Sequence, residues 1–170
     1  MRRLVLLVAL AVLGADPAAQ KASIEYQVKA AYLFNFLKFV EFPATAGPLN
    51  LCVAGRNPFG TSLDELVRGE QIQGRPILSR VILEPEPNCD VVFVPIGAAS
   101  TAYLRAARGT ATLTVGESSD FIAQGGIVNF VLKGNNVRFE IDAMAAEQAK
   151  LRISSRLLQL ATIVRPADAR

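Results

Sequence analysis

The sequence contains no histidine and no tryptophan, and only two of its 170 residues are cysteine. Histidine is the most common general base and metal ligand in proteins, and the usual partner of a serine or cysteine nucleophile. The sequence also lacks the glycine-rich motifs G-x-x-x-x-G-K and G-x-G-x-x-G, which cradle phosphates, and the zinc motif H-E-x-x-H. We therefore expect a protein that is not an enzyme and that has no specific metal site and no cofactor.

The first residues have the pattern of a secretory signal peptide. Arg2 and Arg3 form a short basic region, an apolar run follows from Leu4 to Leu13, and small residues begin at Gly14. We predict a signal peptide over 1–19, with the cleavage site between positions 14 and 22. An uncleaved membrane anchor is the rival interpretation. The mature domain is therefore expected outside the cytoplasm, where thiols oxidise.

The charge gives no reason to expect a nucleic-acid partner. The whole chain has 18 basic and 15 acidic residues. Removal of residues 1–22, which carry Arg2, Arg3, Lys21 and Asp16, leaves 15 basic and 14 acidic residues, and no run of like charges remains. Because 51% of the residues are hydrophobic, the remaining chain is expected to fold as one domain with its own core.

The two cysteines, Cys52 and Cys89, are predicted to form a disulfide. Export places them in an oxidising compartment. Cys52 lies in one predicted strand and Cys89 at the start of another, and neighbouring strands of a mixed sheet bring such residues within reach of each other. A permanent structural staple is the main interpretation, while a redox switch and a reduced, buried pair remain open.

Residues 23–42 are predicted to form a helix that begins after Ser23 as N-cap and stops before Pro43. The helix carries half of the aromatic residues in the chain, which is more apolar surface than one buried face requires. We therefore predict that its flank faces a partner or a second copy, the alternative being that the sheet and the last helix cover it. The stripe expected in the core consists of Tyr26, Ala30, Leu33, Phe36, Leu37 and Val40, and the partner-binding flank of Val28, Tyr32 and Phe39.

The rest of the chain alternates short strands with helices and then ends in a hairpin. The predicted fold is α/β, a single domain with a mixed β-sheet flanked by helices and a β-hairpin near the C-terminal end. The last predicted helix offers a second partner surface through Leu158 and Ile163. Strands are predicted at 49–54, 77–83, 89–96, 111–115, 127–132 and 137–141, and helices at 63–67, 101–107, 143–149 and 154–164.

The loop 57–60 follows the first predicted strand, where α/β folds usually bind ligands. Asn57 is predicted to cap a helix whose first residue is Pro58. A backbone site for an anion at this loop is the alternative.

Five segments, in order, resemble the YfiR family of periplasmic proteins. Together they cover nearly the whole expected domain, 23–164, and leave 165–170 as a tail. Some family members carry a second cysteine pair in the C-terminal half, and this chain does not. The segments are EYQVKAAYLFNFLKFVEFP (25–43), LCVAGRNPFG (51–60), CDVVFVPI (89–96), LTVGESSDFIAQGGIVNFVLKGNNVRFEID (113–142) and ISSRLLQLATIV (153–164).

The resemblance implies a periplasmic regulator. Such proteins bind the periplasmic part of an inner-membrane diguanylate cyclase and repress it, which lowers cyclic di-GMP and the output of exopolysaccharide and biofilm. An outer-membrane-associated protein can sequester the regulator and so release the cyclase. The expected partners are these two proteins and, in a homodimer, a second copy of the chain. A periplasmic sensor module that binds a small molecule is the alternative function.

Overall fold

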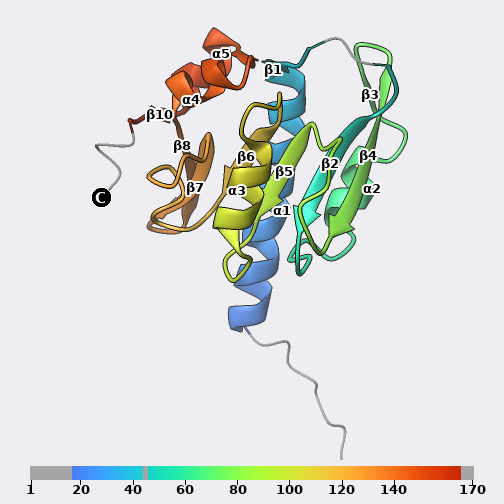
Figure 1. Cartoon of the computed structure of the whole chain (residues 1–170). Coiled ribbons are helices and arrows are strands. Elements are labelled where there is room, and N and C mark those ends of the chain that lie inside the picture. The colour runs from blue at the N-terminus through green and yellow to red at the C-terminus, as the bar shows by residue number, and fades with distance from the viewer. Residues whose placement is uncertain (1–16, 44–45, 166–170) are drawn as a thin grey trace, which may run out of the picture.

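The computed structural model describes residues 17–43 and 46–165, and an eight-stranded mixed sheet forms its centre. The strands lie side by side in the order β10-β8-β7-β6-β5-β2-β4-β3 (Figure 1). Strands β4, β2, β5, β6 and β7 are parallel, whereas β8 runs antiparallel to β7. The bounds are β2 Leu49–Ala54, β3 Gln71–Ile72, β4 Arg75–Ile82, β5 Val91–Val94, β6 Leu113–Gly116, β7 Val128–Lys133, β8 Asn136–Ile141 and β10 Thr162–Ile163.

Helices cover the two faces of the sheet unequally (Figure 1). On one face, here called the α1 face, α1 and α2 pack over Leu51, Phe93 and Phe130. On the other, the α3 face, α3 packs over a smaller core that includes Cys52 and Val92. The helices are α1 Pro17–Phe39, α2 Ser62–Val67, α3 Ser100–Ala107, α4 Ala143–Gln148 and α5 Ser155–Leu160, and a separate antiparallel pair joins β1 Val40–Glu41 to β9 Arg152–Ile153.

The predicted apolar stripe of the first helix is the part that packs on the sheet. Ala30, Leu33, Phe36, Leu37 and Val40 are all buried, as the helical period requires, and Tyr26 is partly buried. The predicted boundaries were wrong at both ends. The helix already includes the residue predicted as its N-cap, because α1 begins at Pro17. It ends at Phe39, three residues before the predicted end, where β1 begins.

Residues 57–60 form a turn closed by Asn57 where the start of a helix was predicted. The Asn57 side chain accepts a hydrogen bond from the Phe59 N–H at 2.9 Å and donates one to the Gly60 carbonyl at 3.0 Å. This closes a local turn, and α2 starts only at Ser62. The prediction that Asn57 caps a helix beginning at Pro58 was therefore wrong.

The C-terminal part confirms the hairpin and shortens the last helix. Strands β7 and β8 pair antiparallel from Val128 opposite Ile141 to Lys133 opposite Asn136, as predicted. Helix α5 ends at Leu160, and Ile163 lies on β10, which pairs parallel with β8. The sequence favoured a longer helix because the apolar spacing continues, but pairing with the open edge of β8 overrides that local preference.

The predicted fold class is confirmed, since this is an α/β domain with one mixed main sheet flanked by helices and a hairpin near its C-terminal end. Of the predicted signal peptide, 1–19, residues 1–16 lie outside the described residues. Most of the predicted tail, 165–170, also lies outside them. Among the described residues, no helix is long and apolar enough to cross a membrane.

Candidate functional site

The connection between β4 and β5 crosses the α3 face without forming a helix. It spans 83–90 and contains two prolines, Pro85 and Pro87, which favour an extended path. A disulfide between Cys89 and Cys52 of β2 fastens its end to the sheet, with a Cα–Cα distance of 5.9 Å. The predicted pairing is therefore present. Closing a loop of 37 residues contributes about 4 kcal/mol in the chain-entropy model.

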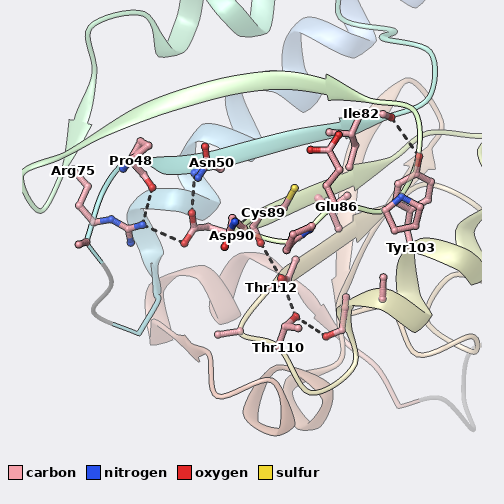
Figure 2. A pocket seen from close by; sticks show the side chains of 18 residues that line it. Pro48, Asn50, Arg75, Ile82, Glu86, Cys89, Asp90, Tyr103, Thr110 and Thr112 are labelled. Carbon is pink, nitrogen blue, oxygen red and sulfur yellow. Dashed lines mark hydrogen bonds and ion pairs between the residues drawn. The ribbon is translucent and has the colours of Figure 1, made fainter.

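A cleft of about 750 Å³ lies beside this disulfide, between α3 and the crossover 83–90 (Figure 2). Its apolar wall comes from Ile82, Val92 and Tyr103. Volumes of this size, with an apolar lining and a few polar groups, are typical of sites for small molecules. No sequence pattern predicted the cleft, because it exists only where the usual crossover helix is missing.

The polar rim of the cleft is held by its own hydrogen bonds (Figure 2). Arg75 donates to the Pro48 carbonyl at 2.8 Å and pairs with Asp90 at 3.3 Å. Asp90 in turn accepts from the N–H of Asn50 at 2.8 Å. Directly before Asp90 in the chain, the Cys89 carbonyl accepts from the Thr112 hydroxyl at 2.8 Å. These bonds fix the side chains of the rim and place a positive group, Arg75, beside a negative one, Asp90, at one end of the cleft.

Tyr103 closes the other end of the cleft. Its hydroxyl donates to the Ile82 carbonyl at 3.3 Å. Burial, and then the nearby carboxylates of Glu84 and Glu86, raise the pKa of this phenol above its ordinary value. Tyr103 is therefore a neutral hydrogen-bond donor at physiological pH, which suits binding rather than proton transfer.

A buried ion pair joins α1 to the end of β6, and sequence reasoning missed it. Lys29, which is 4% exposed, contacts Glu117 at 2.6 Å and also pairs with Glu25 one turn away. Tyr26 donates to Glu117 at 2.9 Å, as does the N–H of Ile96. Burial, and next the Glu117 charge, raise the pKa of Tyr26. The spacing of Glu25 and Lys29 was visible in the sequence, but the partner 88 residues away was not.

The predicted partner-binding residues of α1 occupy different environments. Val28 is 39% exposed. Tyr32 is half-buried, with ring centroids 5.2 Å from Phe139 and 6.0 Å from Phe130. Phe39 is half-buried against the main core. The structure thus leaves Val28 open, and the exposed side chain of Ile24 lies one helical turn before it.

The two predicted residues near the C-terminus are also separated by the fold. Leu158 of α5 is half-buried beside Ile153, where both line a groove of about 390 Å³ with α4. Ile163 is 52% exposed on β10. The helix surface predicted to carry both residues does not exist, since they lie on different elements.

Candidate metal ligands do not gather in the described part of the chain. No group of three or more histidine, cysteine, aspartate or glutamate side chains is placed to hold an ion there. The carboxylates described above are engaged instead with Lys29, Arg75 and backbone N–H groups.

The fold and the cleft define a class of protein: a disulfide-stapled, doubly wound α/β domain. The order β4-β2-β5-β6-β7 is that of flavodoxin-like sheets, with the change of direction between β2 and β5. Within that class the chain belongs to the YfiR/HmsC-like family, whose model matches residues 26–162. No curated protein matches the chain in sequence.

The chain is similar in fold to several solved structures. One of them is described as a conserved domain protein from Vibrio cholerae O1 biovar El Tor, with a TM-score of 0.53 and 15% sequence identity. The match covers 81% of this chain and 59% of that chain. At this identity the likeness concerns the fold alone, and this chain spans about 59% of the length of that structure.

Proposed function

We propose that this protein is a periplasmic regulator that binds the periplasmic part of an inner-membrane diguanylate cyclase and represses it. Repression would lower cyclic di-GMP and with it exopolysaccharide and biofilm output. The observation that carries the proposal is the YfiR/HmsC-like match over residues 26–162. The disulfide supports an oxidising, periplasmic location, which is where such a cyclase exposes its sensory part.

The N-terminal half of α1 is the first proposed docking surface. Val28 and Ile24 are exposed apolar side chains one turn apart, and the half-buried Tyr32 continues the same side of the helix toward Phe39. Apolar anchors beside an aromatic ring are what a protein interface requires. Leu158, in the groove beside α4, and Ile163, on β10, remain as two separate proposed contact residues for an outer-membrane-associated sequestering protein.

Binding to the cyclase is the direct test. The mature domain is mixed with the purified periplasmic segment of the diguanylate cyclase encoded nearest to its gene, and the affinity is measured by calorimetry. Val28→Glu should weaken binding at least about tenfold, because it places a charge in an apolar contact, and tenfold corresponds to about 1.4 kcal/mol. Met144→Glu is the control, since Met144 is also an exposed apolar helix residue but lies on α4.

A cellular measurement completes the test. Deletion of the gene should raise cyclic di-GMP, and a plasmid copy should restore the low level while the Val28→Glu copy should not. No binding to the cyclase segment, together with unchanged cyclic di-GMP after deletion, would refute the proposed function. Binding that Val28→Glu leaves intact would move the docking surface away from α1.

The cleft beside the disulfide favours a second candidate function, a small-molecule sensor. Its volume of about 750 Å³ and its paired Arg75 and Asp90 suit a ligand with both apolar and polar parts. A metabolite screen by thermal shift tests this. Ala106→Trp would fill the cleft from α3 and should abolish any shift, whereas the exposed Met144→Trp should not. A hit that Ala106→Trp does not affect would place the ligand elsewhere.

A further inference from the structure

Segments that are distant in the sequence gather around the start of α1 at one end of the molecule. Lys21 donates a hydrogen bond to the turn between β7 and β8 at 2.9 Å. Tyr26 packs on the ring of Phe59, which follows β2, with ring centroids 5.5 Å apart. Tyr26 also donates to Glu117, which follows β6, and Glu117 accepts from the N–H of Ile96, which follows β5.

These segments lie together because β2, β5, β6 and β7 are parallel, so the turns that follow them leave from the same edge of the sheet. The first turns of α1 extend beyond that edge (Figure 1). The result is a single surface, here called the tip face, which is made of the segments 20–24, 55–61, 95–99, 117–120 and 131–136.

Three large apolar side chains protrude from the tip face. Ile24 is 54% exposed, Ile96 74% and Leu132 54%. Leu132 stands out from the sheet, because β7 continues past the end of β6 to Lys133. Several exposed apolar side chains gathered at one end of a protein mark a contact surface.

The exposed charge of the tip face is mainly positive. Its exposed cations are Lys21, Arg56 and Lys133. Among the side chains described there, Asp120 is the one exposed carboxylate, since Glu117 is buried against Lys29. Apolar side chains ringed by cations are typical of proteins that bind anionic bilayers, because the apolar groups enter the headgroup region while the cations are attracted to lipid phosphates.

We propose that the tip face binds the surface of an anionic lipid bilayer. Ile96 and Leu132 enter the headgroup region, and the three cations lie at the lipid phosphates. The cleft beside the disulfide then faces away from the bilayer and stays open. Its rim residues Asn50, Asp90 and Thr112 lie near the starts of the same strands whose ends carry the tip face.

The contact is reversible and depends on salt. It uses three apolar side chains and three cations, and the attraction between exposed charges is screened within about 8 Å at physiological ionic strength. The inference goes beyond the proposed function, since it concerns lipid alone and stands whether or not the cyclase binds. The tip face adjoins the proposed cyclase-binding surface at Ile24, so one orientation on the bilayer presents Val28 to a membrane enzyme.

Co-sedimentation with lipid vesicles tests the contact in the mature domain with no cyclase present. Vesicles that contain phosphatidylglycerol should bind at least about tenfold more protein than vesicles of phosphatidylcholine alone, and high salt should remove the difference. Lys133→Glu and Leu132→Glu should each weaken binding to the anionic vesicles about tenfold. Arg105→Glu, at an exposed cation of α3, and Met144→Glu, at an exposed apolar residue of α4, are the controls and should leave binding unchanged.

A fluorescent reporter tests which part of the protein meets the lipid. The chain contains no tryptophan, so Leu132→Trp introduces a single indole. Its emission should shift to shorter wavelength when anionic vesicles are added, because the indole leaves water. Met144→Trp, on α4, should show no shift.

Several results would overturn the proposal. They are equal binding to anionic and neutral vesicles, no binding to either, unchanged binding of both Lys133→Glu and Leu132→Glu, and an unshifted Leu132→Trp spectrum at saturating lipid. If the wild type ignores vesicles and Lys133→Glu loses the cyclase segment, the tip face serves a protein partner instead. A wild type that binds anionic vesicles but not the cyclase segment would refute the proposed function and leave this inference intact.

Discussion

The two faces of the sheet are stabilised in different ways. On the α1 face, a long helix buries an aromatic cluster in which Phe36 lies 5.2 Å from Phe139 and 5.8 Å from Phe130 between ring centroids. On the α3 face, one helix of eight residues and two crossovers without helices cover the sheet, and a disulfide fastens one of them. Burial holds the first face, while covalent closure of a loop supports the second and leaves a cleft.

The crossover between β6 and β7 shows how little material covers the α3 face. Its residues form turns, and the ring of Phe121 is fully buried there. A Cβ added at Gly116 or Gly126 would clash with that ring, so both glycines permit the close approach. On the α3 face, the Phe121 side chain thus covers part of the sheet, whereas helices cover the α1 face.

Truncation of the aromatic cluster should have the largest effect. Phe36→Ala removes a fully buried ring from the α1 face and should lower the free energy of unfolding by about 4 to 5 kcal/mol. Urea denaturation measures this. Tyr32→Ala, at the half-buried rim of the same cluster, should cost clearly less, and equal losses would contradict the assignment of Phe36 to the centre of the core.

Removal of the staple should come next. The variant Cys52→Ala/Cys89→Ala should lose about 4 kcal/mol, because the unfolded chain regains the freedom of the closed loop. Hydrogen exchange should then increase most at 83–90 and α3 while the centre of α1 keeps its protection. Uniform loss of protection over both faces would show that they unfold as one unit. It would contradict the idea that the disulfide stabilises mainly the α3 face.

Breaking the buried ion pair should have a somewhat smaller effect. Lys29→Met leaves the Glu117 carboxylate buried without its cation and should cost about 3 kcal/mol. The double variant Lys29→Met/Glu117→Leu should recover part of that loss, because it removes the unpaired charge as well. A double variant less stable than Lys29→Met alone would mean that Glu117 matters mainly through its bonds to Tyr26 and Ile96.

Alkaline pH should give the smallest loss of stability, and this loss should differ between Tyr26 on the α1 face and Tyr103 on the α3 face. The folded state raises the pKa of both Tyr26 and Tyr103, so it retains these protons to higher pH than the unfolded chain does. The associated stability is complete below the ordinary tyrosine pKa of about 10 and is lost as the pH rises through the raised values. Tyr26→Phe should flatten the decline in unfolding free energy more than Tyr103→Phe, because burial and the Glu117 charge raise the pKa of Tyr26 further. The reverse order would contradict this assignment.

Sequence patterns predicted the features that depend on local spacing. The stripe from Ala30 to Val40 follows the helical period, and the hairpin follows its turn residues. The disulfide was predicted from the expected export of a chain with two cysteines. Features made by distant residues could not be predicted in this way. The Lys29–Glu117 pair, the cleft and the two-residue strand β10 arise only when separate segments meet, and β10 also explains why Ile163 left the predicted helix.

Hydrogen exchange in the complex tests the functional account most directly. The domain is exchanged alone and with the periplasmic segment of the diguanylate cyclase. The account predicts new protection in the first half of α1, around Ile24 and Val28, and no change at the crossover 83–90. Protection confined to that crossover and the cleft, or absent from the whole chain at saturating partner, would contradict it.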